Sequence, residues 1–173
     1  MSYDGDKWRN FQDEALKSLT FKSDVNTIFL IKIINSFAPS IIWRVAKNSQ
    51  REKEEAFFAE FRRWRSDIDQ EKFRSPIELL KHLSSLKPTI ETERFELSNE
   101  FFDESMNRFY SIKIPPIVEL QKFGLDGSTT EIQFDGSFLN SKFSWWNNPP
   151  EKWKQLGDTV TDILNQLDSR VSF

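Results

Sequence analysis

The sequence predicts an α+β fold in which several amphipathic helices pack on a mainly antiparallel sheet, within one globular domain over residues 1–173. Segments of alternating apolar and polar residues are interspersed with segments whose apolar residues recur every three or four positions. Neighbouring strand segments are joined by connections too short for a parallel crossover. The chain also lacks a Gly/Ser-rich linker at which a second domain could begin.

The first third of the chain predicts one helix and one hairpin. A short amphipathic helix is expected over residues 6–19, where four apolar side chains share a face: Trp8, Phe11, Ala15 and Leu19. Residues 27–34 are β-branched, apolar and aromatic, which predicts a largely buried strand. The stretch Phe37-Ala38-Pro39-Ser40 interrupts it, and residues 41–45 are expected to pair with it in an antiparallel hairpin.

The middle of the chain predicts helices and one edge segment. From Gln50 onward, a long amphipathic helix is expected from four apolar residues at helical spacing: Phe57, Phe61, Trp64 and Ile68. A second helix is predicted to begin at the capping box Ser75-Pro76-Ile77-Glu78. Residues 89–97 predict an extended edge segment, and Ser98 or Asn99 is expected to cap a third helix whose apolar face has four members: Phe102, Met106, Phe109 and Tyr110.

The last third predicts two strands and a helix. A turn at residues 124–127 precedes a half-buried strand over 130–134, and a second turn leads to a partner strand over 142–146. The segment Asn148-Pro149-Pro150-Glu151 then begins a helix with one apolar stripe: Trp153, Leu156, Val160, Ile163, Leu164 and Leu167.

The composition excludes several classes of function. The absence of cysteine excludes disulfides and thiol chemistry, and the single histidine, His82, is placed on the flank of the capped helix as a structural residue. The five glycines form no phosphate-binding loop, so no catalytic residue, metal or cofactor is predicted. A net charge of −3 and a pI near 5.4 make nucleic acid an unfavoured partner. An acidic N-terminus and the absence of a long uncharged apolar stretch predict a cytoplasmic protein without a membrane partner.

Five residues are candidate binding residues. Adjacent Trp145 and Trp146 in a strand must point to opposite faces of the sheet, so both can be buried only if both faces are covered. Either both belong to the core, which the many aromatic residues favour, or one lies at the surface as a binding residue. Arg62 and Arg63 are expected on the exposed arc of the long helix, where they either pair with nearby glutamates or meet an acidic partner. Asp126, in the first turn of the last third, completes the set.

The C-terminal third resembles a group of uncharacterised bacterial proteins. The residues that carry the resemblance lie between 102 and 156: Phe102-Asp103, Leu125-Asp126-Gly127-Ser128-Thr129, Trp145-Trp146 and Pro150-Glu151-Lys152-Trp153-Lys154-Gln155-Leu156. They match a module of the form Leu-Asp-Gly-x-Thr, Trp-Trp and Pro-x-x-Trp-x-x-Leu. The resemblance implies bacterial origin and an α+β module, and it transfers no catalytic residue.

The sequence therefore predicts a non-enzymatic protein-binding module of the immunity or inhibitor type. The prediction depends on the missing catalytic motifs, the acidic charge and the 17 phenylalanines and 6 tryptophans. Immunity proteins of bacterial toxin systems share this size, acidity and aromatic content. The alternative is a small hydrolase or nuclease whose carboxylates converge only in the folded chain, which requires several of them in one pocket.

Overall fold

The computed structural model describes residues 5–21, 26–36, 38–48, 56–74, 86–115, 118, 126–135 and 140–171. The helices are α1 (Gly5–Leu19), α2 (Ser66–Arg74), α4 (Asn99–Ser111) and α5 (Lys154–Asp168), and a 3₁₀ turn, η1 (Glu151–Trp153), precedes α5. The strands are β1 (Thr27–Asn35), β2 (Ile41–Lys47), β3 (Phe57–Trp64), β4 (Ile90–Leu97), β5 (Ser128–Phe134) and β6 (Ser141–Trp146).

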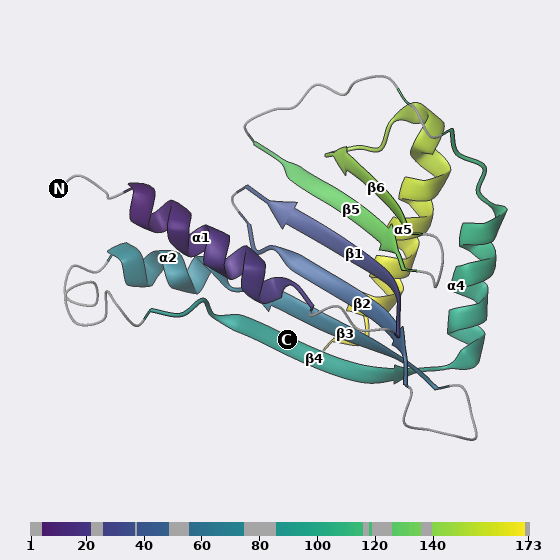
Figure 1. The fold of residues 1–173 in the computed structure, drawn as a ribbon, viewed down its shortest axis with the longest axis horizontal. Helices are drawn as coiled ribbons and strands as arrows, with labels where there is room; N and C mark the ends of the chain where they lie inside the picture. Colours follow the sequence, from purple (N-terminus) through teal and green to yellow (C-terminus); the bar gives the residue numbers. More distant parts are fainter. Residues whose placement is uncertain are drawn as a thin grey trace.

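The six strands form one sheet in the order β4-β3-β2-β1-β5-β6 (Figure 1). Each neighbouring pair is antiparallel. The predicted α+β class with an antiparallel sheet is therefore confirmed. No helix in the described part of the chain is both long and apolar enough to cross a membrane.

Helices cover the sheet from both sides, α1 on one face and α4 with α5 on the other (Figure 1). We call these the α1 face and the α5 face. The larger core lies on the α5 face and contains aromatic side chains from β1, β2, β3, α4, β6 and η1: Phe29, Trp43, Phe57, Phe61, Phe101, Phe109, Trp145 and Trp153. The smaller core lies under α1: Phe11, Ala15, Leu19, Phe21, Ile42 and Trp64.

Most of the predicted elements are confirmed. The structure contains the helix over residues 6–19, the hairpin of β1 with β2, the edge strand β4, the pair β5 and β6, and the C-terminal helix. Ser98 is the N-cap of α4, because its side chain accepts a hydrogen bond from the backbone N–H of Phe101 at 3.2 Å. The helix predicted from Ser75, with His82 on its flank, lies outside the described residues.

The long helix predicted from Gln50 is wrong for residues 57–64, which form β3. A spacing of Phe57, Phe61 and Trp64 fits a helix, but β3 is an inner strand whose two faces are both covered, so alternation between apolar and polar residues is lost. Helical structure begins only at Ser66, the first residue of α2.

A buried ion pair explains why β3 could not be predicted as a strand from its sequence. On the α1 face, Glu60 of β3 lies opposite Arg44 of β2, and both residues are only 8% exposed. Arg44 Nη2 donates to Glu60 Oε2 at 2.6 Å, and the guanidinium lies 4.5 Å from the ring centroid of Phe21 and 5.4 Å from that of Phe58. Glu60 can therefore occupy a buried position, because Arg44 of the neighbouring strand pairs with its charge.

Asp168 offers a test of the larger core. The indole of Trp43 is fully buried, and its Nε1 donates to Asp168 Oδ1 at 3.0 Å, at the last residue of α5. Asp168 is exposed as a residue, but partial burial of its carboxyl beside the indole raises the pKa of that carboxyl, and the bond from Trp43 only partly offsets this. Because the pKa is higher in the folded state than in the unfolded state, the ionised carboxylate destabilises the fold once the pH exceeds the folded-state pKa. The C-terminal end of a helix dipole adds to this cost.

We expect Asp168→Asn to raise the melting temperature at pH 7. The asparagine amide is neutral, and its Oδ1 still accepts from the Trp43 indole. The gain should shrink as the pH falls through the raised folded-state pKa toward the ordinary pKa of aspartate, about 4, below which the wild-type carboxyl is protonated in both states. Thermal unfolding followed by tryptophan fluorescence at several pH values measures the difference. A variant less stable than the wild type at pH 7 would contradict the argument.

Candidate functional site

The two adjacent tryptophans lie on an edge strand of the sheet. β6 is the last strand in the order, with β5 as its neighbour, and β4 forms the opposite edge (Figure 1). Trp145 points to the α5 face and is 4% exposed within the larger core. Trp146 is half-buried. The opposite directions of the two side chains were predicted from the sequence. The structure places Trp146, and not Trp145, nearer the surface.

A tight corner joins Trp146 to the turn before β5. Gly127 has a φ of +154°, and a Cβ added there would lie 2.8 Å from Trp146 Cζ2 and 2.3 Å from Asn147 Oδ1. Asn147, itself at φ +53°, accepts the backbone N–H of Ser128 on its Oδ1 at 2.9 Å and donates its own N–H to Ser128 O at 2.8 Å. Asp126, the neighbouring candidate, is exposed at this corner. The structure thus brings Asp126 near Trp146.

A row of paired charges crosses the sheet beside this corner. Glu131 of β5 forms ion pairs with Lys32 Nζ of β1 at 3.0 Å and with Lys142 Nζ of β6 at 2.6 Å. The Glu131 side chain is 14% exposed and that of Lys142 is 57% exposed. Burial alone would raise the pKa of Glu131, but hydrogen bonds from Lys142 and Lys32 outweigh it and the pKa is lowered. Lys142 is therefore paired within its own chain, although Glu131 is shared with Lys32 and the three side chains together keep one positive charge.

The outer side of β6 presents backbone groups to its surroundings. Asn147, directly after β6, donates its N–H toward β5. Because backbone groups point alternately to the two sides of a strand, those of Lys142 and Ser144 point away from β5. No strand among the described residues lies on that side. The side chains of Lys142 and Ser144 are exposed as well.

The opposite edge differs in its charges. β4 has the sequence Ile-Glu-Thr-Glu-Arg-Phe-Glu-Leu, with four charged residues among eight. β6 has the sequence Ser-Lys-Phe-Ser-Trp-Trp, and its one charged residue is Lys142, which pairs with Glu131. Charged side chains on an edge strand discourage pairing with another strand. The β6 edge therefore accepts a strand more readily than the β4 edge.

The two candidate arginines lie elsewhere, on opposite faces of β3. Arg62 donates to Glu60 Oε1 at 3.0 Å and to the Thr20 carbonyl at 3.1 Å, and its guanidinium lies 4.1 Å from the ring centroid of Phe21. Arg63 pairs with Glu91 of β4 at 2.5 Å. Three strands separate β3 from β6, so the structure does not bring these arginines to Trp146. Their placement on one helix face was wrong because β3 is a strand.

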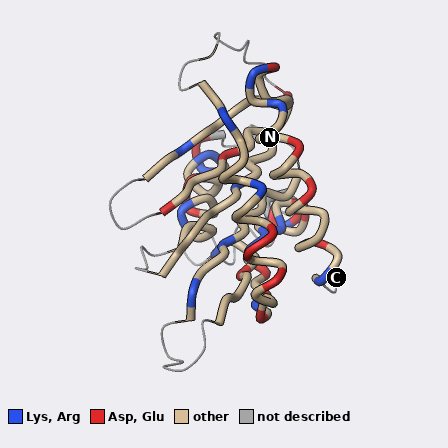
Figure 2. Tube along the Cα trace, turned by 90° about the vertical axis from the view of Figure 1, so that its right-hand side faces the viewer, with Lys and Arg blue, Asp and Glu red and all other residues tan. Residues whose placement is uncertain are grey.

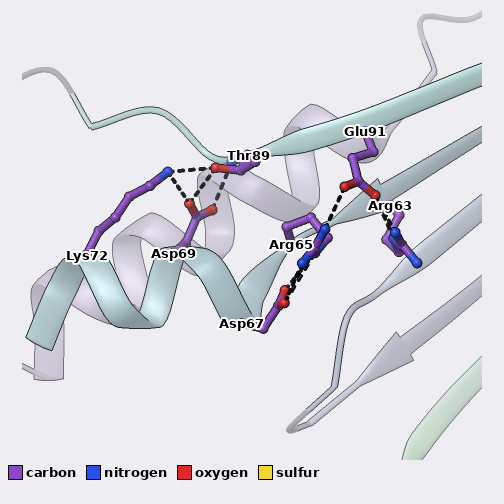
Figure 3. Close-up of polar contacts among 7 residues, drawn as sticks. All are labelled: Arg63, Arg65, Asp67, Asp69, Lys72, Thr89 and Glu91. Atoms are coloured by element: carbon purple, nitrogen blue, oxygen red, sulfur yellow. Dashed lines mark hydrogen bonds and ion pairs between the residues drawn. The ribbon is translucent and has the colours of Figure 1, made fainter. Parts of the chain in front are cut away.

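The densest polar cluster lies around α2 and the start of β4 (Figure 3). Hydrogen bonds from Arg65 lower the pKa of Asp67 to about 2. Burial alone would raise the pKa of Asp69 and Glu91, but hydrogen bonds from Lys72 and Arg65, respectively, help to lower both. A lowered pKa keeps a carboxylate ionised, whereas a general acid needs a raised one. The arrangement is that of a structural ion-pair cluster.

The alternative enzyme would need several carboxylates in one pocket. No group of three or more His, Asp or Glu residues in the described part of the chain could hold a metal ion. The side of the molecule formed by α4 and α5 shows acidic and basic residues together (Figure 2). An example is the ion pair of Arg108 with Asp162 at 2.5 Å, which joins α4 to α5.

No family model, no curated protein and no solved structure matches this chain. The site must therefore be argued from its own geometry. Sequence reasoning missed Lys142, Ser144 and Glu131 as members of the site. The alternation of apolar and polar residues around Glu131 predicted the strand β5. Only the strand order shows that the next strand, β6, lies at the edge of the sheet.

Proposed function

We propose that this protein is a non-enzymatic protein-binding module, of the immunity or inhibitor type, whose β6 edge and Trp146 corner contact a protein partner. One observation carries the proposal: the strand that contains the two tryptophans is an edge strand with outward backbone groups and a single charged residue, Lys142. Strand addition to such an edge supplies main-chain hydrogen bonds, while side chains beside it supply specificity.

Trp146 and Asp126 fit the role of specificity residues. Tryptophan is enriched among the residues that dominate binding energy, because a half-buried indole offers a large and rigid contact area. Asp126 adds an exposed carboxylate at the same corner. A partner strand on β6 would extend the sheet past both residues.

Ser144→Pro tests the proposal. Proline removes the outward N–H of residue 144, and it is tolerated on an edge strand because that N–H takes no part in the β5–β6 ladder. We expect affinity capture from a lysate of the source cells to retain a stoichiometric protein with the wild type and to lose it with the variant. With the purified partner, affinity should fall at least about tenfold.

Ser144→Ala is the matched control, because it removes the same hydroxyl and keeps the N–H. It should retain the partner as the wild type does. Circular dichroism and thermal unfolding establish that both variants are folded. Equal retention by the wild type, Ser144→Ala and Ser144→Pro would exclude β6 as the binding strand, and the absence of any stoichiometric protein on the wild type would count against a binding module.

A further inference from the structure

The β6 edge is complementary to itself. In an antiparallel pair, two strands related by a two-fold axis place a residue i opposite a residue j and j opposite i. Lys142 and Ser144 point their backbone groups outward, so a hydrogen-bonded pair between two copies must use residues of this set. An axis through Ser144 places the two Ser144 residues opposite each other and overlaps the strands from Lys142 to Trp146.

In this register, the side chains that lie opposite each other are compatible on both faces of the sheet. On the α5 face, Phe143 lies opposite Trp145 of the second copy, which continues the apolar layer to which both residues belong. On the α1 face, Lys142 lies opposite Trp146 of the second copy, and a lysine beside an indole is a favourable pair. No charge meets a like charge, since Lys142 is the one charged residue of β6.

The β4 edge does not offer such a match. Its three glutamates and one arginine lie within eight residues, so self-pairing brings several carboxylates close together. Among the described strands, β6 is thus the edge suited to a second copy.

We infer that two copies of this chain pair antiparallel through β6, around a two-fold axis at Ser144, to form one continuous sheet. The inference uses the same strand as the proposed function, and a heterologous partner then competes with the second copy for the edge. Only small shifts of exposed side chains are needed, because Ser144 and Lys142 lie at the surface.

Opposite charges at residue 144 test the axis. We expect the wild type to show a concentration-dependent dimer in sedimentation velocity. Ser144→Lys and Ser144→Glu each place two like charges opposite one another, so each alone should raise the dissociation constant of the dimer at least about tenfold. An equimolar mixture of the two variants should restore the dimer, since lysine then faces glutamate. Ser144→Ala should behave as the wild type.

The outcomes separate this inference from the proposed function. A wild type that stays monomeric at every concentration overturns the inference that two copies pair through β6. Partner capture that is lost in Ser144→Pro would in that case still support the binding module. A dimer unaffected by both charged variants overturns the β6 register. A mixture that fails to restore the dimer lost in the single variants overturns the axis at Ser144. Circular dichroism of each variant establishes that it is folded.

Discussion

Replacing Asp69 with alanine is expected to lower the free energy of unfolding by about 3–5 kcal/mol. Asp69 lies on α2 and is 0% exposed. Its carboxylate accepts a hydrogen bond from Trp64 Nε1 at 2.9 Å. It also accepts from Lys72 Nζ at 2.9 Å and from the backbone N–H and the Oγ1 of Thr89, at 2.8 and 2.6 Å (Figure 3). Alanine leaves these donors without their acceptor, and the buried ones cannot turn to water. Chemical denaturation measures the loss.

The pH dependence of the same variant has a defined sign. Burial tends to raise the pKa of Asp69, but hydrogen bonds from Lys72, Thr89 and Trp64 outweigh it and lower the pKa. The contribution to stability is therefore present above the unfolded-state pKa of about 4 and is lost as the pH falls toward the folded-state pKa. The difference between the wild type and Asp69→Ala should narrow in acid. Asp69→Asn, which keeps the acceptor oxygen, should lose less than the alanine variant.

Gly127→Ala is expected to lower the free energy of unfolding by about 3 kcal/mol, which combines backbone strain at a positive φ with overpacking. The added methyl group would lie within 3 Å of the Asn147 amide and the Trp146 ring. For a domain of this size the melting temperature should fall by about 6–12 °C. Differential scanning calorimetry measures the shift.

A second substitution separates the two sources of this loss. Asn147→Gly removes the amide that the new methyl group would strike, and glycine adopts the positive φ of residue 147 freely. In the Asn147→Gly background, Gly127→Ala should cost less than in the wild type. Equal costs in both backgrounds would show that the Asn147 contact does not limit residue 127.

Local pattern was sufficient for the elements that bury one face. α1, α5 and the β5–β6 pair could be predicted because their apolar residues follow one period, whereas β1 and β2 were predicted from their β-branched and apolar runs on either side of a short break. β3 could not, because Glu60 is buried by an arginine from β2 and the strand carries large side chains on both faces. A long-range ion pair of this kind leaves no mark in the local sequence.

In the candidate site, too, local geometry could be predicted from the sequence and long-range placement could not. The opposite directions of Trp145 and Trp146 follow from strand geometry, and the structure confirms that Trp145 belongs to the core. The position of their strand at the sheet edge depends on β5 pairing with β1, from the opposite end of the chain. Arg62 and Arg63 were assigned to a helix but lie on the strand β3, where adjacent residues point to opposite faces.

The position of β1 in the middle of the sheet also bears on how the chain folds. β1, β2 and β3 follow one another along both the chain and the sheet, so their ladders close over short loops. The ladder between β1 and β5 joins distant parts of the chain, and closing so long a loop costs more conformational entropy before any contact compensates for it. We therefore expect the docking of β5 and β6 onto β1 to be the slow step of folding, and these two strands to join the sheet last.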